Sequence, residues 1–264
     1  MSKVAILQLP TLSLSEARLD YYLKTCKNSG ANLVLLGEYV LNSFFKELEI
    51  MPKSMIKKQS DEKKNSLLNL AKKYDLTIIS PLILVRGNEI LKVIAKISSS
   101  GGKFYEQQIL ISYPHWSERK FFANKMGELN FLTFKHEGLK FGVMFGFETH
   151  FDASFSFMQK KGIDALLVPS ACTFGSKERW AELLKMRAFI NNFYILRANR
   201  IGNYKRKNSD EVWEFYGDSM VITPFGEITQ RLNDSEEMMI ADINKKEILS
   251  ARKILNFSEI AKKL

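Results

Sequence analysis

Short apolar runs recur through the first hundred residues of the chain. Four of them have the length and β-branched content of buried strands: residues 4–9, 33–36, 77–84 and 90–97. Helical patterns separate the first three runs. One covers residues 15–28, with Ser15 as a candidate cap and Gly30 as a stop, and the other covers residues 60–74. This half of the sequence therefore predicts a βαβαβ alternation.

The same order returns in the second half. Further strand-like runs lie at residues 139–145, 165–169 and 194–199, and helical patterns lie between them at 151–161 and 177–191. Strands buried on both faces need helices outside them, so the two halves predict an α/β fold, a four-layer αββα sandwich of two mixed β-sheets. We expect one domain over residues 1–264, with Gly101-Gly102 as a hairpin turn and residues 203–211 as a loop.

Composition changes this picture little. Hydrophobic residues make up 45% of the chain and charged residues 26%, which are ordinary globular values. The apolar runs are far shorter than the roughly 20 residues of a membrane span, and the first ten residues lack the pattern of a signal peptide. We therefore expect a cytoplasmic protein with no membrane association.

Cysteine, histidine and charge exclude several other classes of protein. Cys26 and Cys172 are too few and too far apart for a disulfide framework, and a metal site is not expected because the three histidines show no ligand spacing. No cofactor motif is present. The net charge of +10 could attract nucleic acid, but the basic residues are scattered among acidic ones, so a solvated surface is the better interpretation and nucleic acid is an unlikely partner.

Two segments carry a specific resemblance. In "NLVLLGEYVL" an apolar strand ends at Glu38, and "PSACTFGSKERWAELLKMRAFINNFYILRANRIG" has Pro-Ser, Trp, Leu-Leu, Arg-Ala and a final Asn-Arg-x-Gly in a dense order. Both are similar to segments of the nitrilase (carbon-nitrogen hydrolase) superfamily, and weaker similarity covers nearly the whole chain. The resemblance implies the αββα fold and an active site in which a cysteine attacks, a glutamate acts as the base and a lysine supports the charged intermediate.

Measured against that pattern, two reactive groups are missing. In "GKFYEQQILISYP" the lysine position falls on Gln107, and in "GLKFGVMFGFETHFD" the nucleophile position falls on Gly146. Glu38 matches the base, and Glu118 in "SERKFF" resembles a second glutamate beside the pocket. Without the lysine charge these carboxylates are expected to crowd one another, which would raise the pKa of at least one and favour a protonated or cation-paired state.

No shift of register restores the nucleophile, because the chain has no cysteine between Cys26 and Cys172. Cys172 follows the predicted strand 165–169 and could approach the pocket from there, and His150 could activate water instead. Against these roles, Cys172 would arrive from a different strand with a different angle to Glu38, and a histidine in that turn more often serves packing or hydrogen bonding. Cys26 lies in the first predicted helix, where a small buried thiol is the better interpretation. Glu148, His150 and Cys172 are kept as candidate ligand-binding residues.

Two functions remain open for this sequence. The favoured one is a member of the superfamily with a degenerate Glu-Lys-Cys triad that binds a small amine, amide or ureido compound as a non-catalytic or regulatory protein. The alternative is an active hydrolase of a small linear amide or N-carbamoyl compound with Cys172 or an activated water as the nucleophile. The resemblance also implies a homodimer.

Overall fold

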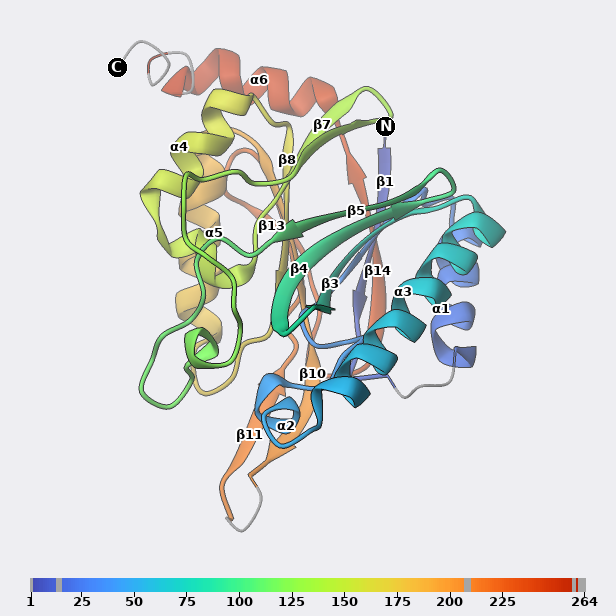
Figure 1. Cartoon of the computed structure of the whole chain (residues 1–264). Helices are drawn as coiled ribbons and strands as arrows, with labels where there is room; N and C mark the ends of the chain where they lie inside the picture. Colours follow the sequence, from blue (N-terminus) through green and yellow to red (C-terminus); the bar gives the residue numbers. More distant parts are fainter. Residues whose placement is uncertain (1, 13–15, 207–209, 258–259, 261–264) are drawn as a thin grey trace.

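Two six-stranded sheets form the centre of the computed structural model, which describes residues 2–12, 16–206, 210–257 and 260 (Figure 1). The first sheet has the strand order β14-β1-β2-β3-β4-β5. Its strands are β1 (Ser2–Gln8), β2 (Leu33–Leu36), β3 (Thr77–Arg86), β4 (Glu89–Ser98), β5 (Gly101–Glu106) and β14 (Glu237–Ile243). The pairs β1·β2 and β2·β3 are parallel and the others antiparallel, so the sheet is mixed.

The second sheet is also mixed and has the order β13-β12-β9-β8-β7-β6. Its strands are β6 (Thr133–His136), β7 (Leu139–Val143), β8 (Ala165–Ser170), β9 (Tyr194–Asn199), β12 (Met220–Ile222) and β13 (Ile228–Arg231). A separate hairpin of β10 (Ile201–Lys205) and β11 (Val212–Tyr216) projects from one end of the molecule in Figure 1.

Alternation along the strands explains why the sheets are covered on both sides. In β1, Val4 and Ile6 belong to the apolar cluster between the sheets, whereas Ala5 and Leu7 belong to the cluster under the helices of the first sheet. Successive side chains of a strand point to opposite faces, so a run that is apolar at every position needs a partner layer on each side.

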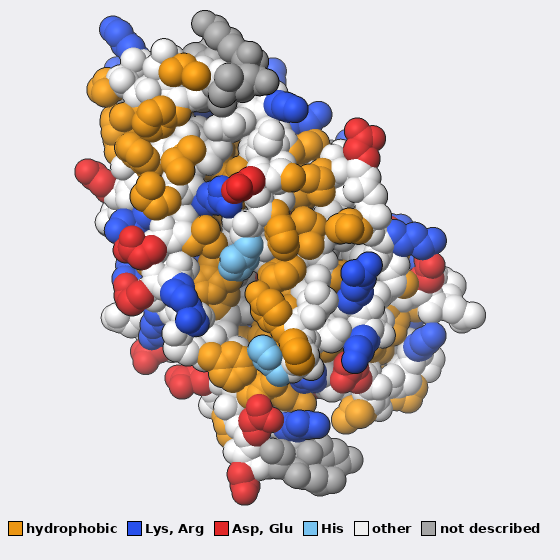
Figure 2. Space-filling model, turned by 90° about the vertical axis from the view of Figure 1, so that its left-hand side faces the viewer, with side chains coloured by type: hydrophobic (Ala, Val, Ile, Leu, Met, Phe, Trp, Pro, Cys, Tyr) orange, Lys and Arg blue, Asp and Glu red, His pale blue; other side chains and the backbone are white. Residues whose placement is uncertain are grey.

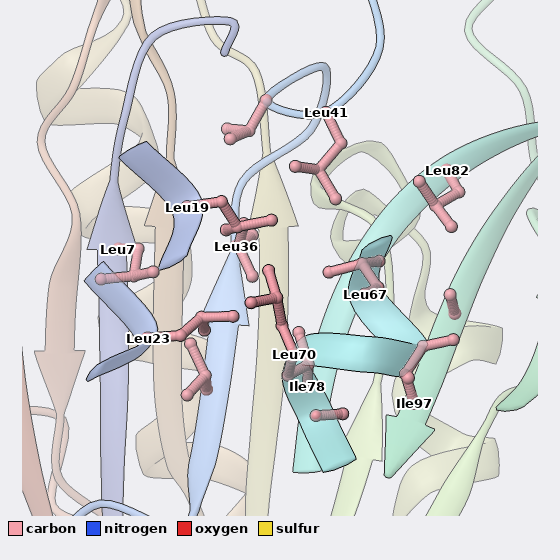
Figure 3. Packing of buried hydrophobic residues seen from close by; sticks show 14 of the residues in the cluster. Leu7, Leu19, Leu23, Leu36, Leu41, Leu67, Leu70, Ile78, Leu82 and Ile97 are labelled. Atoms are coloured by element: carbon pink, nitrogen blue, oxygen red, sulfur yellow. The ribbon is translucent and has the colours of Figure 1, made fainter. Parts of the chain in front are cut away.

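Helices supply the two outer layers. α1 (Ala17–Asn28) and α3 (Lys53–Tyr74) cover the first sheet, and Figure 3 shows Leu19 and Leu23 of α1 with Leu67 and Leu70 of α3 over Leu7, Leu36 and Ile78. α4 (Asp152–Lys161) and α5 (Lys177–Asn191) cover the second sheet, where Leu184 and Ala188 pack with Leu166 and Val168. The remaining helices are α2 (Phe45–Leu48), α6 (Lys245–Leu255) and the short 3₁₀ turns η1 (Glu118–Lys120) and η2 (Gly146–His150).

The predicted sandwich of two mixed sheets between helices is confirmed, and several elements match residue for residue. The predicted runs 33–36, 177–191 and 194–199 coincide with β2, α5 and β9. α3 begins at Lys53, seven positions before the predicted start of that helix. The candidate cap Ser15 lies outside the described residues, and α1 begins at Ala17.

Two predictions about turns need correction. Residues 203–211 were expected to be a loop, but β10 runs to Lys205 and pairs with β11, with Tyr204 opposite Trp213. Both side chains pack on Phe44 of the aromatic cluster around α2, and this packing is what orders the hairpin. The turn between β4 and β5 lies at residues 99–100, because Gly101 already pairs with Ser98.

None of the described helices is long and apolar enough to cross a bilayer.

Candidate functional site

The two sheets come together at the ends of β2 and β8. The amide of Glu38, just past β2, donates to the carbonyl oxygen of Ser170 at the end of β8 (3.1 Å). Gly37 allows this approach: a Cβ there would lie 3.1 Å from the Arg200 nitrogen and 3.2 Å from the Ala198 carbonyl oxygen. A side chain at position 37 would therefore push the second sheet away from Glu38.

A cavity of about 570 Å³ opens beside Glu38. Its walls are largely aromatic and include Tyr113, His115, Trp116, Phe147, Phe174 and Trp180. Ser170, Cys172, Thr173 and Ser176 add polar atoms, and Arg179 is exposed at the rim. On the face shown in Figure 2, hydrophobic side chains gather around two histidines. The site is an apolar cavity, of a size suited to a small molecule, with one carboxylate in its lining.

Three charged side chains are buried together next to this cavity. Lys92 of β4 donates to Glu38 Oε2 at 2.5 Å and to Glu118 Oε1 at 2.7 Å. Tyr39 donates its hydroxyl to the same oxygen of Glu118 (2.5 Å). Lys92 is 1% exposed and Glu118 0%, and Glu38 lines the cavity. The structure thus brings together the two carboxylates predicted from separate segments and adds a cation between them.

A cation pairs with these carboxylates, although position 107 does not supply it. Gln107 is neutral, as the sequence says, but the ammonium group arrives from Lys92 on the neighbouring strand. Lys92 could not be identified from the sequence, because it lies inside the apolar run 90–97 and matches no family motif. A lysine within a strand buried on both faces was the available signal, since a buried lysine is rare without a carboxylate partner.

The protonation of Glu38 reflects its surroundings. Burial raises the pKa of Glu38 to about 7, and the Glu118 carboxylate raises it too, while the charge and hydrogen bond of Lys92 oppose both effects. For Lys92, burial lowers the pKa but the two carboxylates outweigh it, so the net shift is upward and the ammonium form is kept. One carboxylate does have a raised pKa, although burial rather than crowding is the largest cause.

Gln107 and Glu148 lie behind the cavity wall and not among the side chains that line it. Gln107 is buried and donates to the Ile109 carbonyl oxygen at 2.8 Å. Glu148 accepts the backbone amides of Gln108 (2.7 Å), Ile109 (3.1 Å) and Phe145 (2.9 Å). The Glu148 carboxylate therefore connects the segment after β5 to η2 through hydrogen bonds. These bonds account for its burial without any contact to a ligand.

Cys172 and His150 both line the cavity. Burial raises the pKa of the Cys172 thiol, although the Arg197 guanidinium opposes this, so the neutral thiol is favoured over the thiolate that covalent attack requires. The His150 Nδ1 lies 2.9 Å from the Phe147 carbonyl oxygen and the ring packs edge-on against Trp180. Within the described part of the chain, no carboxylate or imidazole is hydrogen-bonded to either group, as the base that activates a nucleophile would be.

Gly146 opens η2 at the cavity wall, and its amide donates to Glu38. A Cβ at this position would lie 2.8 Å from Ser170 Cβ and 3.5 Å from the Trp180 ring. Both neighbours are buried or half-buried, so the space for any side chain at position 146 is already filled.

We expect Gly146→Ala to lower the free energy of unfolding by about 1–3 kcal/mol, because overpacking forces Ser170 and the end of β8 to move. Gly175→Ala is the matched control: a Cβ there meets nothing within 4 Å, and a change within about 0.5 kcal/mol is expected. Urea unfolding of both variants measures the difference. Equal stabilities would mean that position 146 tolerates a side chain.

Comparisons with known proteins identify the family of the chain. The family model described as carbon-nitrogen hydrolase matches residues 3–253. The "Hydrolase in agr operon" of Staphylococcus aureus is 23% identical over 95% of this chain and 94% of its own length. An N-carbamoylputrescine amidase of Oryza sativa is 24% identical over 87% of this chain and 80% of its own length.

Solved structures show the same fold. A carbon-nitrogen hydrolase from Helicobacter pylori superposes with a TM-score of 0.85 at 21% identity, covering 98% of this chain and 94% of that one. Since the family model spans almost the whole sequence and this neighbour shares the complete sandwich, the chain belongs to the carbon-nitrogen hydrolase family, within the nitrilase superfamily.

Proposed function

We propose that this protein binds a small amide, ureido or amine compound in the cavity beside Glu38 and does not hydrolyse it through a covalent cysteine intermediate. One observation carries the proposal: a glycine, Gly146, stands beside Glu38 at the cavity wall, where the family pattern has its nucleophile, and the adjoining space is filled by Ser170. A glycine has no side-chain atom that can attack.

The chemistry of the cavity supports a ligand of this class. Glu38 has one oxygen engaged by Lys92 and lies in the lining, so it can accept a hydrogen bond from an N–H group of a ligand. The aromatic walls suit an alkyl chain or a cationic head. Relatives named N-carbamoylputrescine amidase and deaminated glutathione amidase act, by their names, on ureido and amide compounds, which supports the same class here.

Ligand binding is tested by thermal shift with three probes: N-carbamoylputrescine, putrescine and propionamide. We expect at least one to raise the melting temperature, and Glu38→Gln to weaken that probe roughly 10- to 100-fold, because a charge-assisted hydrogen bond is lost. Glu128→Gln is the control, since Glu128 is an exposed carboxylate outside the cavity lining. No response to any probe would contradict the proposed ligand class.

Turnover is tested separately by ammonia release from the amide and ureido probes. The proposal expects no release above the blank for the wild type. Release that disappears in Cys172→Ala would overturn it in favour of the alternative hydrolase with a rearranged nucleophile. Release that survives in Cys172→Ala but not in Glu38→Gln would point to an activated water.

The assembly of the protein also stays a proposal, a homodimer as the family resemblance implies. Exposed apolar side chains on α5 and α6 support it, namely Met186, Ile190, Leu249 and Ile254. None of these four residues is in the cavity lining. Pairing through them would leave the cavity open to ligands.

A further inference from the structure

Lys92 and Gln107 stand opposite each other on adjacent strands. The β4·β5 ladder pairs Val93 with Glu106, and the same register sets Lys92 against Gln107 one step further along. The Gln107 amide donates to the Lys92 carbonyl oxygen (2.9 Å), which extends the pairing to this position. Directly opposed residues of an antiparallel pair point to the same face with Cβ atoms about 5 Å apart, so a long side chain from either position reaches the same place.

Asn124 fixes this pair of positions further. Its side-chain oxygen accepts the Lys92 amide at 2.9 Å, and its side-chain nitrogen donates to the carbonyl oxygens of Lys92 (2.7 Å) and Gln107 (3.2 Å). One amide side chain thus holds both backbones at the edge of the site. The relative placement of the two side chains is set by the backbone and not by the ion pairs alone.

We propose that Lys92 has taken over, from the facing strand, the cation position that Gln107 leaves neutral, and that it is a positioning residue that favours the ionised form of Glu38 and holds it at the cavity. Of these three described residues only Glu38 is in the lining, so the trio presents a single carboxylate to a ligand. The inference deepens the proposed function, because it says why the cavity selects a hydrogen-bond donor or a cation.

The competing interpretation is that Lys92 forms only a structural salt bridge. The charges of the buried cluster distinguish this interpretation from a positioning role. When both carboxylates are ionised, the one ammonium group between them leaves one net negative charge in a buried cluster, next to a cavity that can hold a compensating cation or N–H group. The other ionisable groups near Glu38 are Arg200, Cys172 and Tyr39. Burial raises the pKa values of Cys172 and Tyr39, so both are neutral, whereas Arg200 keeps its charge although burial lowers its pKa to about 10; Lys92 is the cation that bonds Glu38 directly, at 2.5 Å.

The test follows the titration of Glu38 in protein labelled with ¹³C-glutamate, with the Glu38 carboxyl signal assigned by its loss in Glu38→Gln. In Lys92→Gln we expect the pKa of Glu38 to rise by about one pH unit or more and the melting temperature to fall on the order of 10 °C. In the exchanged variant Lys92→Gln/Gln107→Lys, the lysine returns to the facing strand, and both values are expected to move back toward those of the wild type.

Lys96→Gln is the matched control, because Lys96 lies on the same strand and contacts the Phe134 ring, not the carboxylates; it should leave the titration of Glu38 unchanged. If Lys92→Gln does not fold, Lys92→Gln/Glu118→Gln removes one charge of each sign, and the pKa of Glu38 should still rise, since the charge of Lys92 affects it more than that of Glu118. An unchanged Glu38 titration in the folded Lys92 variants overturns the proposal, and so does an exchanged variant that recovers nothing.

This experiment uses no ligand, so its failure is distinct from the failure of the ligand panel. A recovered titration in the exchanged variant, together with a silent panel, would keep the role of Lys92 and remove the proposed ligand class. The reverse result would keep the ligand and reduce Lys92 to a structural ion pair.

Discussion

Arg197→Met is expected to lower the free energy of unfolding by about 3–5 kcal/mol, which is the usual loss when one partner of a buried ion pair is removed. Arg197 is 0% exposed. Its guanidinium donates to Ser170 Oγ (3.1 Å) and to both the carbonyl oxygen and Oδ2 of Asp218 (3.2 Å each). Methionine fills a similar volume but leaves these acceptors without their donor, and among the described residues the buried Asp218 carboxylate keeps only its bond to Arg231.

Arg231→Met is the matched control for Arg197, because Arg231 bonds the other oxygen of Asp218 (2.5 Å) from a side chain that is 34% exposed. Solvent screens that pair, and a loss of about 1 kcal/mol or less is expected. Urea unfolding at neutral pH measures both variants. Equal losses would show that burial does not set the strength of the Asp218 pairs. The charge and hydrogen bond of Arg197 also lower the pKa of the Cys172 thiol, so the loss of Arg197 should raise that pKa further.

Most of the fold could be predicted because its central strands are largely apolar and are buried at every position. The runs at residues 33–36 and 194–199 can be stable only between two covering layers, which is the arrangement the sandwich provides. The β10–β11 hairpin could not be predicted in this way. Its order comes from Tyr204 and Trp213 packing on Phe44, a contact across more than a hundred residues that no local pattern contains.

The candidate site was predictable only where a residue matched a family motif. Glu38 and Glu118 were identified from separate segments, and their meeting at Lys92 depends on strand order. Lys92 was missed because its position opposite Gln107 follows from the register between β4 and β5. Spacing along the chain does not contain that register. The backbone role of Glu148 was hidden for a similar reason: the amides it accepts come from residues about forty positions earlier as well as from Phe145.

Glu148 leads to the second large expected effect, a loss of stability as the pH rises from about 4.5 to 7. Burial raises the pKa of Glu148 in the folded protein to about 7, from an ordinary value of 4.5, although three backbone amides oppose the shift. Below pH 4.5 the group is protonated in both states and its contribution is fully present. Between the two values the unfolded chain ionises and the folded one does not, so stability falls with rising pH by about 3 kcal/mol.

Urea unfolding of the wild type and Glu148→Gln across pH 4 to 8 isolates this contribution, since Glu38 titrates in the same range in both proteins. Glutamine keeps a carbonyl oxygen for two of the amides but places an NH₂ group against the third, so the variant should be less stable than the wild type at pH 4. That deficit should shrink by about 3 kcal/mol as the pH passes 7, because only the wild type must ionise a buried carboxyl. The exposed Glu128→Gln should run parallel to the wild type throughout. A Glu148→Gln curve that also runs parallel would mean that Glu148 is already charged in the folded protein at pH 5, held so by its three amide donors.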